Sequence, residues 1–135
     1  MEVFPTDKVV LVGAKLAGIN GNASIEIHLE PFELRIDDYQ EAVETSIRLD
    51  GIGIPIDPSL LEEKVFEFPI NPNDGYIDGS VYFLAVHNPV DVTHIEFGEI
   101  VNDTLPIVLT INWVLEFEKT GFKNFESILK TCIDL

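Results

Sequence analysis

The side chains that most often carry acid–base or metal chemistry near neutral pH are scarce in this chain. Histidine occurs only as His28, His87 and His94. His87 and His94 flank Asp91, but a divalent metal needs three or four such ligands that converge. Histidines in turns or partly buried positions are therefore the favoured interpretation. We predict no metal site at these histidines and no cofactor.

Residues 71–79 carry many of the oxygen ligands that calcium prefers. The segment does not match the EF-hand register, because no acidic residue precedes glycine at the required offset and no bidentate glutamate follows. Asn-Asp-Gly is also the usual composition of a turn. A plain loop is therefore favoured, and calcium binding is left open.

Motifs of nucleophilic and nucleotide chemistry are absent. The chain has no Gly-x-Ser-x-Gly elbow, phosphate-binding loop, His-Glu-x-x-His or Gly-x-Gly-x-x-Gly. Cys132 has no histidine near it in the sequence, which favours a structural thiol over a nucleophile. Glu116 and Glu118 would suit glycoside hydrolysis geometrically, yet carboxylates are so common here that such a pair is expected by chance. We predict that the protein is not an enzyme.

The charge balance is the strongest compositional signal. The chain holds 24 acidic and 8 basic residues, for a formal net charge of −16. Such a surface repels nucleic acids and anionic membranes and attracts cationic partners. We therefore expect a basic protein partner, no nucleic acid and no membrane. Solubility alone is the competing explanation, since net charge bears on association and not on fold.

The compartment and the domain organisation follow from equally simple features. The single cysteine, Cys132, cannot form an internal disulfide, which favours a reducing compartment. The first residues lack a basic segment followed by an apolar one, and no apolar run is long enough to cross a bilayer. We expect a soluble cytoplasmic protein. Its 135 residues suit one domain, residues 1–135, with a core that needs no disulfide.

The clearest structural pattern lies in residues 107–118, where every odd position is large and apolar and the even positions become increasingly polar. Successive side chains of a strand point to opposite faces, whereas a helix would scatter these apolar residues around its circumference. The segment therefore predicts a strand with one face in the core. Trp113 shares the parity of the core side chains.

The same two-residue alternation predicts strands in residues 24–30, 32–36, 43–49, 64–70 and 125–135, and residues 9–16, apolar on both faces, predict a central strand. Residues 80–87 and 92–101 are predicted to form a hairpin joined by a turn at residues 88–91. A change of parity at Pro31 predicts a bulge or a strand that crosses between sheets. Residues 57–63 predict a short helix, because Pro58 suits its start. A helix stays open as the alternative for residues 124–131.

About seven or eight strands, with at most one or two short helices, predict an all-β fold. The pattern suits a sandwich or a barrel of antiparallel strands. Of these we expect an antiparallel β-sandwich of the jelly-roll or immunoglobulin-like type.

The polar faces of the predicted strands carry ordered acidic groups. If these strands are neighbours, one sheet presents a carboxylate-rich face that docks a basic protein. The residues predicted to contact this partner are Glu26, Glu30, Glu96, Thr110, Asn112, Glu116 and Glu118. An outer sheet face that merely meets water is the competing explanation.

Two functions fit these observations better than the third alternative, an enzyme that uses acidic residues in the mouth of a barrel. The first is a non-enzymatic protein-binding module, for example a small cytoplasmic inhibitor or immunity-type protein that neutralises a basic enzyme such as a nuclease. The second is a carbohydrate- or small-ligand-binding β-sandwich, in which Tyr39, Tyr76 or Tyr82 stacks on a sugar ring while Trp113 stays in the core. An exposed edge strand would also allow a homodimer.

Overall fold

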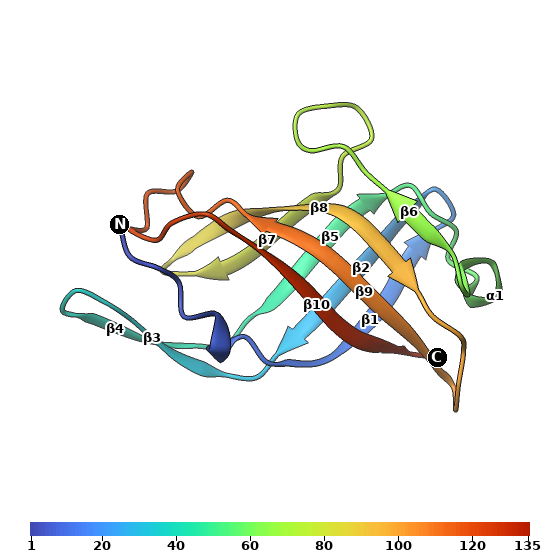
Figure 1. The fold of residues 1–135 in the computed structure, drawn as a ribbon, viewed down its shortest axis with the longest axis horizontal. Helices are drawn as coiled ribbons and strands as arrows, with labels where there is room; N and C mark the ends of the chain where they lie inside the picture. Colours follow the sequence, from blue (N-terminus) through green and yellow to red (C-terminus); the bar gives the residue numbers. More distant parts are fainter.

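The computed structural model describes residues 1–135, and strands make up 58% of the chain (Figure 1). The strands are β1 (Leu11–Ile19), β2 (Asn22–Leu29), β3 (Phe32–Ile36), β4 (Tyr39–Val43), β5 (Ser46–Ile52), β6 (Val65–Glu67), β7 (Asp78–Phe83), β8 (Val86–Phe97), β9 (Thr104–Trp113) and β10 (Phe125–Asp134). The helical segments are the 3-10 turn η1 (Thr6–Lys8) and the helix α1 (Pro58–Leu61).

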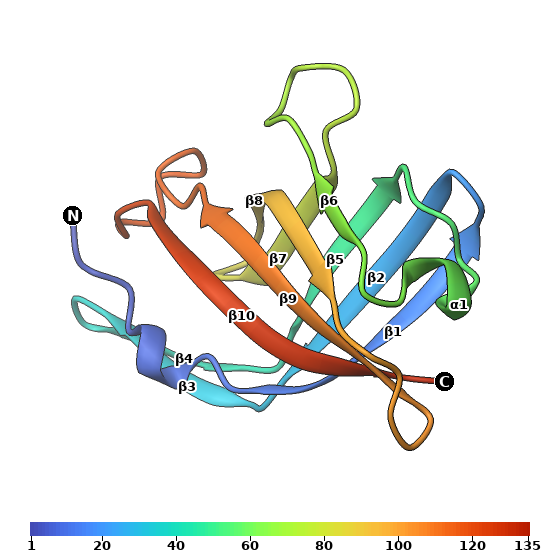
Figure 2. The same ribbon diagram turned by 45° about the vertical axis from the view of Figure 1, so that its right-hand side comes forward.

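Eight of these strands form one sheet in the order β6-β8-β7-β5-β2-β1-β10-β9, and a further pairing between β8 and β9 closes it. Seven strands thus make a closed barrel, and β6 is an extra strand beside β8. Figures 1 and 2 show β9 and β10 crossing the front of this barrel, with β1, β2 and β5 behind them.

The all-β prediction is confirmed, but the predicted sandwich is wrong. The alternation of apolar and polar residues shows which face of a strand meets the core. Strands of a sandwich and of a barrel have the same alternation, so the pattern cannot distinguish the two folds. Closure depends on β8, which is 12 residues long. One edge of β8 pairs with β9, and the other pairs first with β7 and then with β6. Because β8 is long enough to pair with both β7 and β9, it joins these two strands and closes the sheet into a barrel.

The predicted hairpin with a turn at residues 88–91 is also wrong. The turn lies at Leu84 and Ala85, whose φ angles of 53° and 62° are left-handed, and β8 runs straight through residues 88–91. Asn88 and Pro89 were interpreted as turn residues. Instead, the buried Asn88 side chain donates from Nδ2 to the carbonyl oxygens of Val81, Phe83 and Val86 and so holds the turn from inside the barrel.

The strand predicted over residues 107–118 has a confirmed core face and wrong ends. The inward side chains of β9 are all buried, and they are Leu105, Ile107, Leu109, Ile111 and Trp113. The strand ends at Trp113, and the chain turns after Val114, whose N–H still donates to the Pro89 carbonyl oxygen. Leu115 still reaches the core, whereas Phe117 is 69% exposed, contrary to its predicted inward position.

Other local predictions fared better. The parity change at Pro31 marks the point where the chain leaves the barrel, since β3 and β4 form a separate two-stranded sheet. The short helix is confirmed as α1, and Asp57 caps it by accepting the N–H of Ser59 at 3.0 Å. The last segment is the strand β10 rather than a helix. No helix has the length and apolar character required to cross a membrane.

Aromatic side chains close the end of the barrel beside the N-terminus. Phe4 is buried there, and its ring lies 5.3 to 6.4 Å, centre to centre, from five other aromatic rings. Those rings belong to Phe32, Phe83, Trp113, Phe122 and Phe125. The Trp113 indole N–H also donates to Ser127 Oγ at 2.8 Å. The first residues of the chain are thereby anchored to the core.

Candidate functional site

Four carboxylates and one side-chain amide line up across the outside of five neighbouring strands. Asp50 on β5 lies directly opposite Asp78 on β7. On the other side of β7, Gly79 lies opposite Val90 of β8. The preceding residue of β7, Asp78, therefore lies opposite the following residue of β8, Asp91. Asp91 lies opposite Asn112 on β9, which lies opposite Glu126 on β10. We call this set the acidic row: Asp50, Asp78, Asp91, Asn112 and Glu126.

No lysine or arginine nitrogen lies within 4.0 Å of a carboxylate of the acidic row, although Lys15 and Arg48 line a hollow together with Asp50. Directly opposed side chains of neighbouring strands have Cβ atoms about 5 Å apart, and like charges at that distance destabilise the sheet. The only contact within 4.0 Å between a carboxylate and a lysine or arginine joins Glu26 to Arg48 at 3.7 Å, outside the row. Within the row, Asp50 accepts a hydrogen bond from Ser24 Oγ at 2.9 Å. The negative charge of the row is therefore available to a binding partner.

A hollow of about 300 Å³ lies at the centre of the acidic row, between β8 and the segment that leads into β7. Asp78 and Asp91 both line it, together with Tyr76, His87 and Asn71. Carboxylates accept charge-assisted hydrogen bonds from guanidinium and ammonium groups, and an aromatic ring adds attraction for a cation. The lining therefore has the chemistry to receive one lysine or arginine side chain.

Three of the predicted contact residues lie on the neighbouring strands β8 and β9, and only Asn112 is directly opposite a residue that lines the hollow. Thr110 and Asn112 project outward from β9, and Glu96 projects outward from β8. The two strands are hydrogen-bonded neighbours, with Thr110 opposite His94 and Asn112 opposite Asp91. These predicted residues therefore extend the surface of the acidic row.

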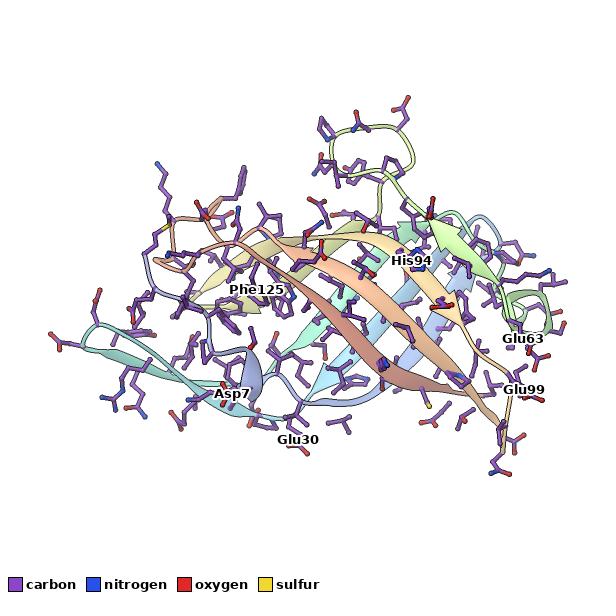
Figure 3. The ribbon with its side chains drawn as sticks, viewed as in Figure 1. Asp7, Glu30, Glu63, His94, Glu99 and Phe125 are labelled. Atoms are coloured by element: carbon purple, nitrogen blue, oxygen red, sulfur yellow. The ribbon has the colours of Figure 1, made fainter.

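Two predicted residues lie elsewhere on the barrel. Glu26 projects from β2, where it pairs with Arg48, and Glu30 follows the end of the same strand. β1 and β10 separate β2 from β9 in the closed sheet. Figure 3 shows Glu30 at the lower border of the molecule, far from His94 on β8. Neither carboxylate lies beside Asn112, although Glu26 lines a small hollow together with Asp50 of the acidic row.

The last two predicted residues lie in the loop after β9 and not on a strand. Glu116 forms a reciprocal clamp with Asn124: the Glu116 N–H donates to Asn124 Oδ1 at 2.8 Å, and Glu116 Oε2 accepts the Asn124 N–H at 2.9 Å. This geometry gives Glu116 a structural role. Glu118 instead lines an open hollow of about 750 Å³ at the end of the barrel, with Asp37, Asp38 and Lys119.

Sequence reasoning missed Asp78 and Asp91 as site residues for an identifiable reason. Both were placed in predicted loops, Asp78 in residues 71–79 and Asp91 in the supposed turn. The alternation of Val86, Asn88, Val90 and Val92, which a bulge between Val92 and His94 shifts to Ile95 and Phe97, was the available signal that Asp91 lies on a strand. The opposition of Asp50 to Asp78 depends on strand order.

The three histidines lie on separate parts of the barrel wall. His28 Nδ1 lies 3.1 Å from Ser46 Oγ, and the His87 ring lies 4.8 Å from that of Tyr82. His94 Nδ1 lies 3.9 Å from Glu67. No group of three histidine, cysteine or acidic side chains converges as a metal site requires. Cys132 is exposed on β10.

The comparisons with known proteins give no relative of this chain. No protein-family model matches it, and no similar protein was found among curated proteins or among solved structures.

Proposed function

We propose that this protein is a non-enzymatic binding module that holds a basic protein partner through the acidic row. The observation that carries the proposal is the alignment of Asp50, Asp78 and Asp91 across adjacent strands with no lysine or arginine nitrogen within 4.0 Å of their carboxylates. Such an arrangement weakens the free protein through repulsion, and a cationic partner relieves it. A small inhibitor or immunity-type protein that neutralises a basic enzyme is the form of this function that we favour.

The two parts of the surface contribute differently to binding. The net charge of −16 accelerates encounter with a cation over a long range and loses this effect in high salt. The hollow between Asp78 and Asp91 supplies a defined anchor, where a buried side chain of the partner adds affinity and register. The proposed interaction is therefore both salt-sensitive and dependent on these two carboxylates.

A pair of charge-matched double variants tests the proposal. Asp78→Asn with Asp91→Asn removes two charges from the hollow, whereas Asp7→Asn with Asp134→Asn removes two exposed charges elsewhere. Calorimetric titration with an arginine-rich peptide of about ten residues should show binding weakened about tenfold or more in the first variant and about twofold or less in the second. An equal loss in both variants would show that only net charge matters and would refute the anchor.

Carbohydrate binding is a second candidate because of one exposed aromatic side chain. Tyr82 is 47% exposed and borders a hollow of about 200 Å³ lined by polar groups, including Ser46, Arg48 and Ser80. A ring in such a position suits stacking against a sugar. Trp113 cannot serve, since it is buried in the core. Saturation-transfer contacts between a sugar and the Tyr82 ring, abolished by Tyr82→Ala, would favour this function over the first.

A further inference from the structure

A hollow of about 750 Å³ opens at the end of the barrel that the aromatic rings around Phe4 close. Leu84 and Gly121, which line it, directly adjoin Phe83 and Phe122 of that aromatic group. Three connections that are far apart in the chain meet here (Figures 1 and 2): the β3–β4 turn, the β7–β8 turn and the loop after β9. Small-molecule sites of about 300 to 1,000 Å³ often occupy the mouth of a β-barrel. We call this hollow the mouth hollow, and its size and place suit a ligand.

Two contacts hold the β3–β4 hairpin in position as one wall of the mouth hollow. The Leu84 N–H in the β7–β8 turn donates to Glu41 Oε2 of β4 at 2.8 Å. Ile36 of β3 packs against Gly121 so closely that a side chain at residue 121 would collide with Ile36 Cδ1. The hairpin forms its own two-stranded sheet, so these contacts, and not a backbone ladder, join its tip to the barrel. The mouth hollow is therefore already formed in the free protein.

The lining of the mouth hollow is largely apolar, although it lies at the surface. Ala85 and Tyr39 are exposed there, and Tyr39 keeps 54% of its accessible surface. Leu84 and Ala85 have left-handed φ angles of 53° and 62°, which asparagine and glycine adopt more readily in hairpin turns. The turn itself therefore does not favour apolar residues. The hydrophobic lining residues are Ile36, Tyr39, Leu84, Ala85 and Val86.

The charged groups of the mouth hollow favour a cation. Asp37, Asp38 and Glu118 outnumber Lys119, and none of the four has an ion-pair partner within 4.0 Å. Apolar surroundings strengthen the attraction between opposite charges, and the Tyr39 ring adds attraction for a cation. An anion would meet three carboxylates. The complementary occupant therefore combines a positive group with an apolar body.

We propose that the mouth hollow binds a small organic cation, namely a primary amine that carries an apolar ring. The ring lies against Ile36, Leu84 and Val86, and the ammonium group lies beside Asp38 and Glu118. This site is independent of the proposed function, because no residue of the acidic row lines the mouth hollow.

Three probes of similar size and different charge test the class of ligand. They are phenethylamine, which is protonated near neutral pH, the neutral phenethyl alcohol and the anionic hydrocinnamate. Nuclear magnetic resonance titration of isotope-labelled protein in about 150 mM salt should give phenethylamine a Kd of about 1 mM or lower, with the largest shift changes at Tyr39, Leu84 and Gly121. The alcohol should bind about fivefold more weakly or worse, and hydrocinnamate should not saturate below about 20 mM. Equal Kd values for amine and alcohol, or amine shifts spread over the whole surface, would overturn the proposal.

Two charge-matched double variants test the carboxylates. Asp38→Asn with Glu118→Gln removes two charges from the mouth hollow, whereas Glu63→Gln with Glu99→Gln removes two at the opposite end of the molecule (Figure 3). We expect the Kd of phenethylamine to rise about fivefold or more in the first variant and to stay within about twofold of the wild-type value in the second. An equal rise in both would show that the amine responds only to net charge and would refute the site.

Two further variants separate the mouth hollow from the acidic row. Tyr39→Ala removes an aromatic wall and should raise the Kd of phenethylamine about threefold or more. Asp78→Asn with Asp91→Asn should leave that Kd within about twofold, because these residues do not line the mouth hollow. A large loss of amine binding in the row variant, with none in Tyr39→Ala, would place the amine in the acidic row and overturn the proposal.

Discussion

At the scale of single residues, Asn88 shows how one polar side chain determines the path of the chain. It is fully buried, and its Nδ2 donates to three carbonyl oxygens at 3.2 to 3.3 Å around the turn at Leu84 and Ala85. Its Oδ1 has no hydrogen-bond partner. The amide is therefore held in one orientation by the carbonyl oxygens that surround the nitrogen.

Asn88→Asp should be severely destabilising. The change replaces a donor with a carboxylate oxygen that faces three carbonyl oxygens away from water, which costs about 3–5 kcal/mol. Urea denaturation measures this loss in the free energy of unfolding. Asn73→Asp makes the same chemical change in an exposed loop and should cost less than about 0.5 kcal/mol. A small effect at Asn88 would mean that the amide does not hold the turn.

Residue 88 also marks a limit of sequence reasoning at this scale. Asparagine followed by proline is typical turn chemistry, so the local pattern placed the turn at residues 88–91 and not at Leu84 and Ala85, where it lies. It did not indicate that the Asn88 side chain would hydrogen-bond to the backbone around a turn several residues earlier, because these hydrogen bonds depend on the pairing of β7 with β8. By contrast, the cap at Asp57 was predictable, since it involves only the next residues of the chain.

At the scale of elements, the N-terminal segment depends on Phe4. Phe4 belongs to no strand or helix, but its ring lies close to aromatic rings of β3, β7, β9, β10 and the loop before β10. It therefore joins elements that are not consecutive in the chain. The cluster closes one end of the barrel.

Phe4→Ala should destabilise the protein by about 3–5 kcal/mol, because it leaves a cavity among five aromatic rings. Val3→Ala is the matched control, since Val3 is 76% exposed and should change stability by less than about 0.5 kcal/mol. Chemical denaturation monitored by Trp113 fluorescence measures both. If the two variants were equally stable, Phe4 would not hold the barrel end.

The strands themselves were largely predictable from alternation, but their arrangement was not. The inward positions of β2 and β5 are buried as expected, because apolar and polar residues alternate in a strand that has one face in the core. These residues are Ile25, Ile27, Ile47 and Leu49. Closure into a barrel depends on the pairing of β8 with β9. That pairing is a contact between two segments, and the alternation within either segment does not predict which strand will be its neighbour. The same holds for the acidic row, whose members belong to five strands.

At the scale of the whole molecule, uncompensated charge is the dominant feature. Only one of 24 carboxylates lies within 4.0 Å of a lysine or arginine nitrogen. Mutual repulsion at a net charge of −16 destabilises the folded state, and dissolved salt screens it.

Thermal stability should therefore rise with salt. Between about 10 mM and about 500 mM sodium chloride we expect the melting temperature to increase by about 3–6 °C. The increase should be smaller in the double variant Asp78→Asn with Asp91→Asn, because opposed carboxylates are removed from the row. Scanning calorimetry makes the comparison. A melting temperature that falls with salt would contradict the picture of a self-repelling surface.

The central claim is that the acidic row, and not the barrel surface in general, receives a cationic partner. Nuclear magnetic resonance titration of isotope-labelled protein with an arginine-rich peptide maps the contact one amide at a time. We predict that shift changes concentrate at Tyr76, Asp78, Asp91 and Asn112. Changes of equal size around Glu30, which lies far from His94 in Figure 3, would contradict the account.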